Sequence, residues 1–174
     1  MKKKALLVYG NPNQKDNPQE FYKNCERDIK IMSEIAEADG YDICKIQDFD
    51  LEKKLQEYTN KDMNSFLFYF TGHACQALLG NLTASFDLDP FFELIDKIKG
   101  EKIVILDSCT QKYIPSRKFS KNTKVFGGDE IDKESGLSKL FFDAVMCYNK
   151  KLEEIDKKTF DEMKHNWVYV GEVA

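Results

Sequence analysis

The sequence lacks the cysteine pattern of a disulfide-rich or zinc-binding protein. It contains no C-x-x-C pair, and its five cysteines are odd in number and irregularly spaced. Four-cysteine zinc sites and small disulfide scaffolds both need regularly spaced cysteine pairs. We therefore expect free thiols in a reducing, cytoplasmic setting, some of them as core filler and one as a candidate nucleophile. The cysteines are Cys25, Cys44, Cys75, Cys109 and Cys147.

The sequence also lacks long hydrophobic runs and an excess of positive charge. No apolar run approaches the length that spans a bilayer, so we expect no membrane partner. The first residues, MKKKALLVYG, do not have the long apolar core of a secretory signal. A net charge of −4 argues against nucleic acid as a partner, because phosphate binding needs a basic field. The composition, 42% hydrophobic and 32% charged, is typical of a globular protein.

Short apolar segments alternate with amphipathic segments along the chain, and this pattern predicts an α/β fold. The segments 66–72 and 102–106 consist mainly of apolar residues, as expected for strands buried on both faces of a parallel sheet. The first helix has Asn17 as its N-cap and Pro18 at its first position. Other strands are expected at 5–10, 41–46, 124–128 and 167–173, and helices at 17–40, 50–58, 89–100, 135–152 and 152–163. Strands separated by helices predict one domain over 1–174, with a mainly parallel central sheet and helices on both faces.

Two reactive side chains are predicted to lie at the same edge of this sheet. His73 follows the strand 66–72, and Cys109 follows the strand 102–106. Sites in open parallel sheets form beyond the carboxyl ends of the strands, so neighbouring strands would bring both side chains into one crevice. Histidine is the usual base that activates a thiol nucleophile. Backbone N–H groups at Cys109 and at Ala74, in the turn after the histidine, would then stabilise the oxyanion of acyl transfer.

Simpler explanations exist for both residues. A histidine at the end of a strand is often structural, and a buried cysteine is often core filler. A metal site is a further alternative, with His73, Cys75 and Cys109 as ligands. The H-x-C spacing is a weak signal for zinc and no fourth ligand is evident, so no metal is expected.

A carboxylate lies on the apolar stripe of the first helix. Asp28 is three residues after Cys25 and four before Met32. A carboxylate in that position is costly unless it is paired, hydrogen-bonded or lines a pocket. One explanation is a salt bridge to a nearby lysine or a local hydrogen bond. The other is an acidic pocket that receives a cation, and Asp107, two residues before Cys109, is placed to reach the same pocket.

These motifs resemble those of the caspase-like cysteine peptidases, specifically the metacaspase and orthocaspase branch. FYFTGHA is similar to the family's strand that ends in F/Y-x-S-G-H-G, and VILDSCTQ is similar to the strand that ends in D-S-C-H-S-G. NCERDIKIM is similar to the metacaspase helix motif G-C-x-N-D-A. GGDEIDKESGLSKLFFDAV resembles the later segment in which an acidic residue precedes G-x-F-T and an apolar helix. The order and approximate spacing hold from Ala5 to about Val145.

The resemblance implies a three-layer caspase-like α/β fold and a cysteine endopeptidase with a Cys-His dyad. Cys109 would be the nucleophile, His73 the acid/base partner, and the N–H groups of Ala74 and Cys109 the oxyanion donors. Asp28 and Asp107 would form an acidic S1 pocket that prefers Arg or Lys at P1 of a peptide or protein substrate. A caspase proper carries Q-A-C-R-G and basic S1 residues for a substrate aspartate, which this cysteine motif does not match.

The sequence departs from the family pattern around both catalytic motifs. Ala74 stands where the family has a glycine, and Thr110 and Gln111 follow the cysteine in place of His-Ser. The segment between the histidine and the cysteine lacks the acidic run of many metacaspases, which argues against calcium activation, and we expect no cofactor. These departures support an alternative, a catalytically inactive caspase-fold module that binds or regulates a partner.

The resemblance also divides the chain into a large-subunit-like part, 1–109, a linker loop, 110–124, and a small-subunit-like part, 125–174. The linker is polar and basic, which is typical of a solvated loop, and that is the favoured interpretation. If S1 accepts basic residues, the linker is also a candidate for self-cleavage. Its basic residues are Lys112, Arg117, Lys118, Lys121 and Lys124.

A third hypothesis is a flavodoxin-like protein, because LLVYGNPNQ resembles the opening strand and phosphate loop of flavin-dependent reductases. Such a loop would be rich in hydroxyl residues, and none lies between Gly10 and Lys15, which argues against a flavin. A caspase-type sheet can dimerise through its last strand, here 167–173. The sequence leaves both a monomer and a homodimer open.

Overall fold

The computed structural model describes residues 2–47, 51–75, 78–80, 85–109, 119–120, 122–128, 136–165 and 168–172. Those residues form a six-stranded sheet and a three-stranded sheet, with helices packed on the larger one. Within the same residues, no helix combines the length and hydropathy needed to cross a membrane.

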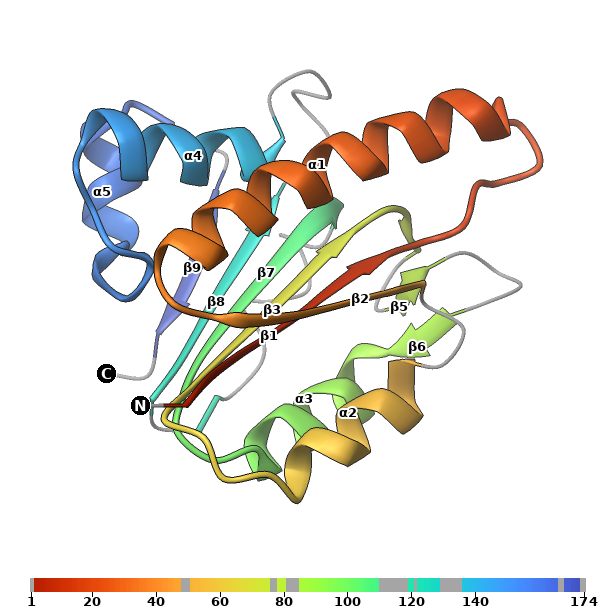
Figure 1. Cartoon of the computed structure of the whole chain (residues 1–174). Helices are drawn as coiled ribbons and strands as arrows, with labels where there is room; N and C mark the ends of the chain where they lie inside the picture. The colour runs from red at the N-terminus through yellow and green to blue at the C-terminus, as the bar shows by residue number, and fades with distance from the viewer. Residues whose placement is uncertain are drawn as a thin grey trace.

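The central sheet has the strand order β2-β1-β3-β7-β8-β9 (Figure 1). Neighbouring strands from β2 to β8 are parallel, and β9 pairs with β8 in the antiparallel direction. The strands are β1 (Lys3–Tyr9), β2 (Asp42–Gln47), β3 (Ser65–Thr71), β7 (Glu101–Cys109), β8 (Thr123–Gly128) and β9 (Tyr169–Glu172). The predicted mainly parallel sheet is confirmed, and the last predicted strand lies at one edge of it.

Helices cover both faces of this sheet, as predicted. In Figure 1, α1 and α4 lie across one face, and α2 and α3 lie against the opposite face. We call these the α1/α4 face and the α2/α3 face. Each has its own cluster of buried apolar side chains, and the cluster on the α1/α4 face also includes Phe160 of α5. The helices are α1 (Pro18–Ala38), α2 (Leu51–Thr59), α3 (Leu88–Lys97), α4 (Leu137–Cys147) and α5 (Lys157–Glu162).

The alternation of side chains along β3 decides which residues meet which helices. Phe68 and Phe70 belong to the cluster on the α2/α3 face. Leu67 and Tyr69 belong to the cluster on the α1/α4 face. The same alternation places Thr71, the last residue of β3, on the α1/α4 face. A strand that is buried on both sides explains why its sequence is apolar nearly to its end.

Helix α1 has the predicted boundaries. The Asn17 side chain accepts hydrogen bonds from the N–H groups of Gln19 (3.1 Å) and Glu20 (3.3 Å), and Pro18 is the first helical residue. The chain leaves the helix through Gly40, whose φ of 85° is in the left-handed region that glycine adopts without steric cost. The cap is important for the site because it fixes the loop that enters the helix from β1.

A small antiparallel sheet follows β3, and the sequence did not predict it. Its strands are β4 (Ala74–Cys75), β5 (Leu78–Gly80) and β6 (Ser85–Asp87), which pair in chain order. Strands of two or three residues are too short for hydrophobic periodicity to show.

The helix predicted over 135–152 is shorter than expected. It ends at Cys147, and Asn149 adopts a left-handed φ of 52°, which stops the helix. The segment 152–163, which was predicted as a helix that either continues the preceding one or is separate from it, forms a 3-10 turn, Leu152–Glu154, and then α5.

Most of the predicted linker 110–124 lies outside the described residues. Thr123 and Lys124 begin β8, so the strand predicted from 124 starts one residue earlier, within the predicted linker. The Lys124 Nζ donates to the carbonyl oxygens of Glu153 (2.6 Å) and Ile155 (3.3 Å), so this lysine is not a free site for self-cleavage. The other basic residues of the linker lie outside the described residues: Lys112, Arg117, Lys118 and Lys121.

Candidate active site

The register between β3 and β7 places the two predicted catalytic residues at the same edge of the sheet. Thr71 pairs with Asp107 in the parallel ladder. His73 is two residues beyond Thr71, and Cys109 is two residues beyond Asp107. The side chain of Cys109 lies outside what the structure describes, so the dyad itself stays a prediction.

Cys109 is the last residue of β7, whereas the sequence suggested that it follows the strand. The β7–β8 register shifts between Leu106 and Cys109, and Cys109 then pairs with Gly128. The predicted strand ended with the apolar run at Leu106. The polar residues Asp107 and Ser108 continue the strand because it leaves the core there and reaches the edge where parallel sheets form their sites.

Gly72 allows the end of β3 to lie close to the end of β1. The Gly10 N–H donates to the carbonyl oxygen of Thr71 at 2.9 Å. Gly72 has a φ of 151°, and a Cβ added there would lie only 3.1 Å from the Cα and N atoms of Gly10. Any other residue would push the two backbones apart. The glycine of the T-G-H motif therefore fixes the turn that leads into His73.

His73 is held by contacts on its edge and on its face. Its Nε2 lies 2.6 Å from Oδ2 of Asp16, a residue of the loop between β1 and α1. Its ring stacks on Phe21 in the first turn of α1, with 5.2 Å between ring centroids and 16° between planes. The side chain is 34% exposed. The histidine therefore lies at the protein surface and is not part of the core.

Asp28 and Asp107 lie close together beside the start of α4. Ser138 connects them, because its Oγ donates to Oδ1 of Asp28 (2.9 Å) and its N–H donates to Oδ2 of Asp107 (3.3 Å). Thr71 Oγ1 donates to Oδ2 of Asp28 at 2.9 Å. The Tyr69 hydroxyl donates to Oδ2 of Asp107 at 2.6 Å. The structure thus brings together the two carboxylates that were predicted to share a pocket.

Asp107 also caps the first turn of α4. Its Oδ1 accepts a hydrogen bond from the Leu137 N–H at 3.0 Å. A negative charge is favourable at the N-terminus of a helix, where backbone N–H groups point outward. A Cβ at Gly136 would lie 3.1 Å from one carboxylate oxygen, so the glycine leaves room for Asp107.

The burial of the pair raises the pKa of both carboxyl groups. Desolvation, followed by the charge of Asp28, raises the pKa of Asp107 to about 6. Desolvation also raises the pKa of Asp28, while hydrogen bonds from Thr71 and Ser138 partly oppose the rise. Two carboxylates that repel each other in a poorly solvated place are a favourable environment for a cation.

A guanidinium already lies near Asp28. Arg27 Nη2 is 3.7 Å from Oδ1 of Asp28, whose side chain is 14% exposed. The arginine itself is 56% exposed, so this pair contributes little to stability. It shows that the carboxylate is open to a basic group from the solvent side.

Cys25 lies three residues before Asp28 in α1, and its environment makes it unreactive. The side chain is 4% exposed. Burial, with the charge of Asp28 as the next cause, raises the pKa of the thiol to about 12. Thiolates are the reactive form of cysteine, so Cys25 does not compete with Cys109 as a nucleophile.

The remaining predicted positions follow His73 directly. Ala74 and Cys75 form β4, and their backbones pair with Leu79 and Leu78. Among the side chains that the structure describes, no three potential metal ligands of the His, Cys, Asp or Glu types come together. The side chains of Cys75 and Cys109 are not among them, so the zinc alternative stays untested.

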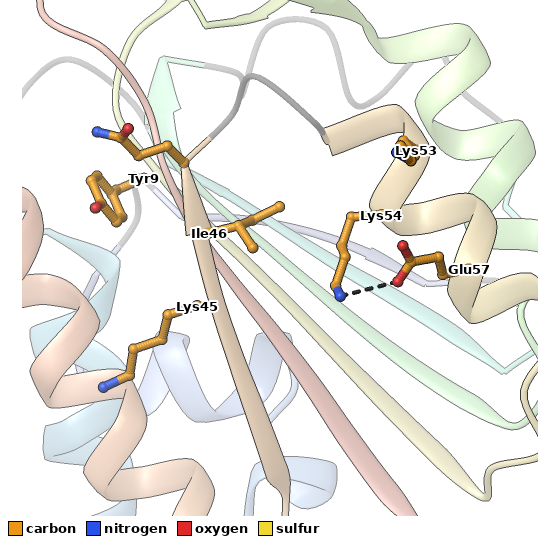
Figure 2. A pocket seen from close by; sticks show the side chains of 7 residues that line it. Tyr9, Lys45, Ile46, Lys53, Lys54 and Glu57 are labelled. Atoms are coloured by element: carbon orange, nitrogen blue, oxygen red, sulfur yellow. Dashed lines mark ion pairs between the residues drawn. The ribbon is translucent and has the colours of Figure 1, made fainter.

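A hollow of about 510 Å³ lies at the edge of the sheet and is a separate feature (Figure 2). None of the predicted site residues lines it. Lys54 and Glu57 form an ion pair in this hollow, with 3.0 Å between the charged atoms. Lys45 and Lys53 also line it, so the lining carries more positive than negative charge. A basic surface of this kind does not suit a substrate Arg or Lys. Its lining residues are Tyr9, Lys45, Ile46, Gln47, Lys53, Lys54 and Glu57.

The sequence did not identify four polar residues that contact the predicted site: Thr71, Tyr69, Ser138 and Asp16. Tyr69 is surrounded by apolar residues in β3, and Ser138 lies in an apolar helix, so neither stood out. Asp16 lies in a loop without periodicity. One signal was present for Asp16: it directly precedes the N-cap of α1, at the edge of the sheet where His73 was expected.

The comparisons with known proteins agree with this architecture. A model of the family described as "Caspase domain" matches residues 2–165. A solved structure described as "structure of pro-sf-caspase-1" aligns with a TM-score of 0.68 at 8% sequence identity, covering 98% of this chain and 91% of that chain. At that identity the structural match shows the fold alone. A search of curated proteins found no match.

Proposed function

Because the chain belongs to the caspase-domain family, whose members are cysteine peptidases, we propose that it is an endopeptidase that cleaves peptide bonds after Arg or Lys. In this proposal it is a metacaspase-like, cytoplasmic enzyme that acts on peptides or proteins. Cys109 is the nucleophile and His73 the acid/base group, without a cofactor.

The observation that carries this proposal is the pairing of Thr71 with Asp107 at the ends of two adjacent strands. One pair of strand ends supplies the carboxylates of the pocket, through Asp107 itself and through the hydrogen bond from Thr71 to Asp28. Two residues later the same strand ends supply the histidine and the cysteine. The residues proposed to bind a basic side chain and the residues proposed to react therefore follow one another at the ends of the same two strands.

The reaction follows acyl transfer through a thioester. His73 takes the proton of the Cys109 thiol, and the thiolate attacks the carbonyl carbon of the scissile bond. The N–H groups of Ala74 and Cys109 stabilise the oxyanion of the tetrahedral intermediate. When the intermediate collapses, the C–N bond breaks and His73 gives its proton to the leaving amine. Water, deprotonated by the same histidine, then hydrolyses the thioester and restores the thiol.

Specificity for Arg or Lys follows from the charge of the pocket. A P1 ammonium or guanidinium beside Asp28 and Asp107 offsets the repulsion between the two carboxylates and favours their ionised forms. A P1 aspartate would add a third negative charge. Arginine suits the site particularly well, because its fork of N–H donors matches carboxylate oxygens.

A specific observation favours the second candidate, a caspase-fold module that binds without cutting. All four oxygens of the two carboxylates already accept hydrogen bonds from the protein, from Thr71, Ser138, Leu137 and Tyr69. Such a network also serves to fasten α4 to the sheet. Together with Ala74 in place of glycine, it is consistent with a fold that has kept the pocket and lost turnover.

The test is a scan of fluorogenic peptides that differ only at P1, with wild type, Cys109→Ala and Asp107→Asn. We expect cleavage after Arg and Lys only, no cleavage by Cys109→Ala, and the same rates with calcium or with a chelator. An electrophile with a basic P1 group should label Cys109 in wild type and much more slowly in His73→Ala. If no peptide is cut while a basic peptide still binds, and binding weakens in Asp107→Asn, the binding module is the correct function.

A further inference from the structure

The loop between β1 and α1 brings a carboxylate to the histidine of the proposed dyad. Nε2 of His73 and Oδ2 of Asp16 are 2.6 Å apart. We propose that Asp16 is a positioning residue that completes a Cys109–His73–Asp16 triad and leaves Nδ1 of His73 as the nitrogen that takes the thiol proton. This inference rests on the proposed function.

The chemistry of the two partners decides which ring nitrogen is free. Hydrogen bonds from the Asn13 N–H and from His73 hold the pKa of Asp16 below its ordinary value, so the carboxyl group is ionised at neutral pH. An ionised carboxylate only accepts hydrogen bonds, which requires the proton on Nε2. Neutral imidazole has a single N–H, so Nδ1 carries the lone pair. The contact with Asp16 therefore selects one tautomer of the histidine.

Asp16 is itself held in place by hydrogen bonds to Asn13 and by the attachment of its loop at both ends. Its Oδ2 accepts from the Asn13 N–H at 2.7 Å, and its own N–H donates to the Asn13 carbonyl oxygen at 3.1 Å. The next residue, Asn17, caps α1. At the other end of the loop, the Gly10 N–H bonds the end of β3. A loop that is tied to both elements holds a charged side chain at a defined position with little freedom to turn away.

Phe21 completes the arrangement by fixing the plane of the imidazole. The two rings are nearly parallel, at 16°, while Asp16 contacts the ring at its edge. A stacking contact restrains rotation out of the plane, and a hydrogen bond restrains rotation within it. Together they aim the opposite edge of the His73 ring in one direction, as a general base requires.

A purely structural role explains this contact less well. The two side chains are 34% and 30% exposed. Ion pairs at that exposure contribute little to folding stability. The same contact has a large effect on function if the histidine transfers protons, because orientation and tautomer of the base determine the rate.

The experiment compares Asp16→Ala with His73→Ala and with Asn17→Ala as a matched control. Asn17→Ala removes the neighbouring cap of α1 but leaves the carboxylate, so it lowers the melting temperature and should reduce turnover by much less than Asp16→Ala. For Asp16→Ala on a P1-Arg peptide we expect kcat about tenfold lower and KM within about twofold of wild type, because orientation of the base acts on the chemical step.

A second readout needs no substrate. Iodoacetamide modification at pH 7 is followed at each cysteine by mass spectrometry, with the exposed Cys147 as the internal reference. We expect His73→Ala to slow modification of Cys109 about tenfold and Asp16→Ala to slow it by several-fold, because each reduces the thiolate fraction. The rate at Cys147 should be the same in all variants.

The outcomes distinguish the role of Asp16 from the Cys109–His73 dyad on which it rests. If His73→Ala reduces both turnover and the Cys109 rate while Asp16→Ala leaves both within twofold of wild type, the dyad stands and the role of Asp16 is wrong. If Asn17→Ala reduces kcat as much as Asp16→Ala, the effect is structural and the triad is again wrong. If His73→Ala itself has no effect on either readout, the dyad fails, and the proposed function fails with it.

Discussion

The two faces of the central sheet are formed by the same strands but differ in chemistry. On the α2/α3 face, β3 contributes Phe68, whose ring lies 4.9 Å from that of Phe91 in α3. On the α1/α4 face the same strand contributes Tyr69 and Thr71, whose hydroxyls donate to the half-buried carboxylates of Asp107 and Asp28. The core of the α2/α3 face is therefore apolar up to the ends of its strands, whereas the core of the α1/α4 face becomes polar toward the carboxyl ends of the strands.

The difference shows how a single strand serves stability and function at once. Neighbouring residues of a strand point to opposite faces, so each face is free to take its own chemistry. Apolar packing on one side supplies free energy of folding, which compensates for the cost of burying two like charges on the other. Substitutions on the two faces should therefore differ in their effect on activity, and removing one of the two like charges should raise stability where removing an apolar ring lowers it.

The largest effect is expected from a substitution on the α2/α3 face. Phe68→Ala removes a fully buried ring and should lower the free energy of unfolding by about 3–5 kcal/mol. Activity per folded molecule should stay at the wild-type level, because the side chain points away from the site. Urea unfolding measures the change, and Met146→Ala, at a side chain that is 65% exposed, is the control within about 0.5 kcal/mol of wild type. A loss below 1 kcal/mol would mean that this face is loosely packed.

A smaller effect of the opposite sign is expected from Asp107→Asn. The folded protein holds the Asp107 proton to about pH 6, and the unfolded chain releases it near the ordinary value of 3.8. The free energy of unfolding of the wild type should therefore fall as pH rises from about 4 to 6. Asp107→Asn has no proton to release at this position, so its free energy of unfolding should not show this decrease. We expect the variant to be more stable by about 1–3 kcal/mol at pH 7 and cleavage after Arg to fall at least tenfold.

Unfolding curves measured from pH 4 to 7 test this expectation, and the two proteins should differ least at the acid end. Lower stability of Asp107→Asn at pH 7 would contradict it. That result would mean that the hydrogen bonds from Leu137 and Ser138 to the charged oxygens outweigh the cost of burying the charge.

The smallest effect is expected from Tyr69→Phe, which removes only the hydroxyl that donates to Asp107. Loss of one buried hydrogen bond should cost about 1 kcal/mol. This hydrogen bond lowers the pKa of Asp107, so its loss raises that pKa further above about 6. The acid limb of kcat/KM for a P1-Arg substrate should therefore move to higher pH.

Tyr41→Phe is the matched control for this substitution. Its hydroxyl makes an equally short hydrogen bond, 2.6 Å to Ser65 Oγ, at the start of β3 and far along the strand from Asp107. We expect a similar loss of stability and an unchanged pH profile. Equal shifts of the profile in both variants would show that the polar core acts on activity only through general stability.

The sequence predicted the fold well where burial controls it. The apolar runs of β3 and β7 and the capped α1 were recognised because core strands and amphipathic helices have patterns that follow from packing alone. The strands β4, β5 and β6 were missed because pairs of two or three residues leave no pattern. The end of β7 was placed too early because Asp107 and Ser108 are polar. They contribute to the candidate site and not to the apolar core, so the hydrophobic pattern stops before the strand does.

The candidate site was predictable to a similar degree. Asp28 stood out because a carboxylate on an apolar stripe requires an explanation, and the structure places it beside Asp107. The hydroxyls of Tyr69 and Ser138 gave no signal, because serine and tyrosine are common in cores and helices. Asp16 was missed because contacts between a loop and a distant strand end depend on the tertiary fold.

The turn at 152–154 is bound to the central sheet by two lysines, and these contacts determine what happens when the chain is cleaved in the predicted linker. Lys3 of β1 bonds the Glu153 side chain at 2.5 Å, and Lys124 of β8 bonds its backbone carbonyl oxygen at 2.6 Å. The strand β8 is in addition paired along β7. If the chain were cut between residues 110 and 121, these contacts should therefore keep the two fragments associated in one folded protein. Such a preparation should show two bands on a denaturing gel and elute as one species in its native buffer.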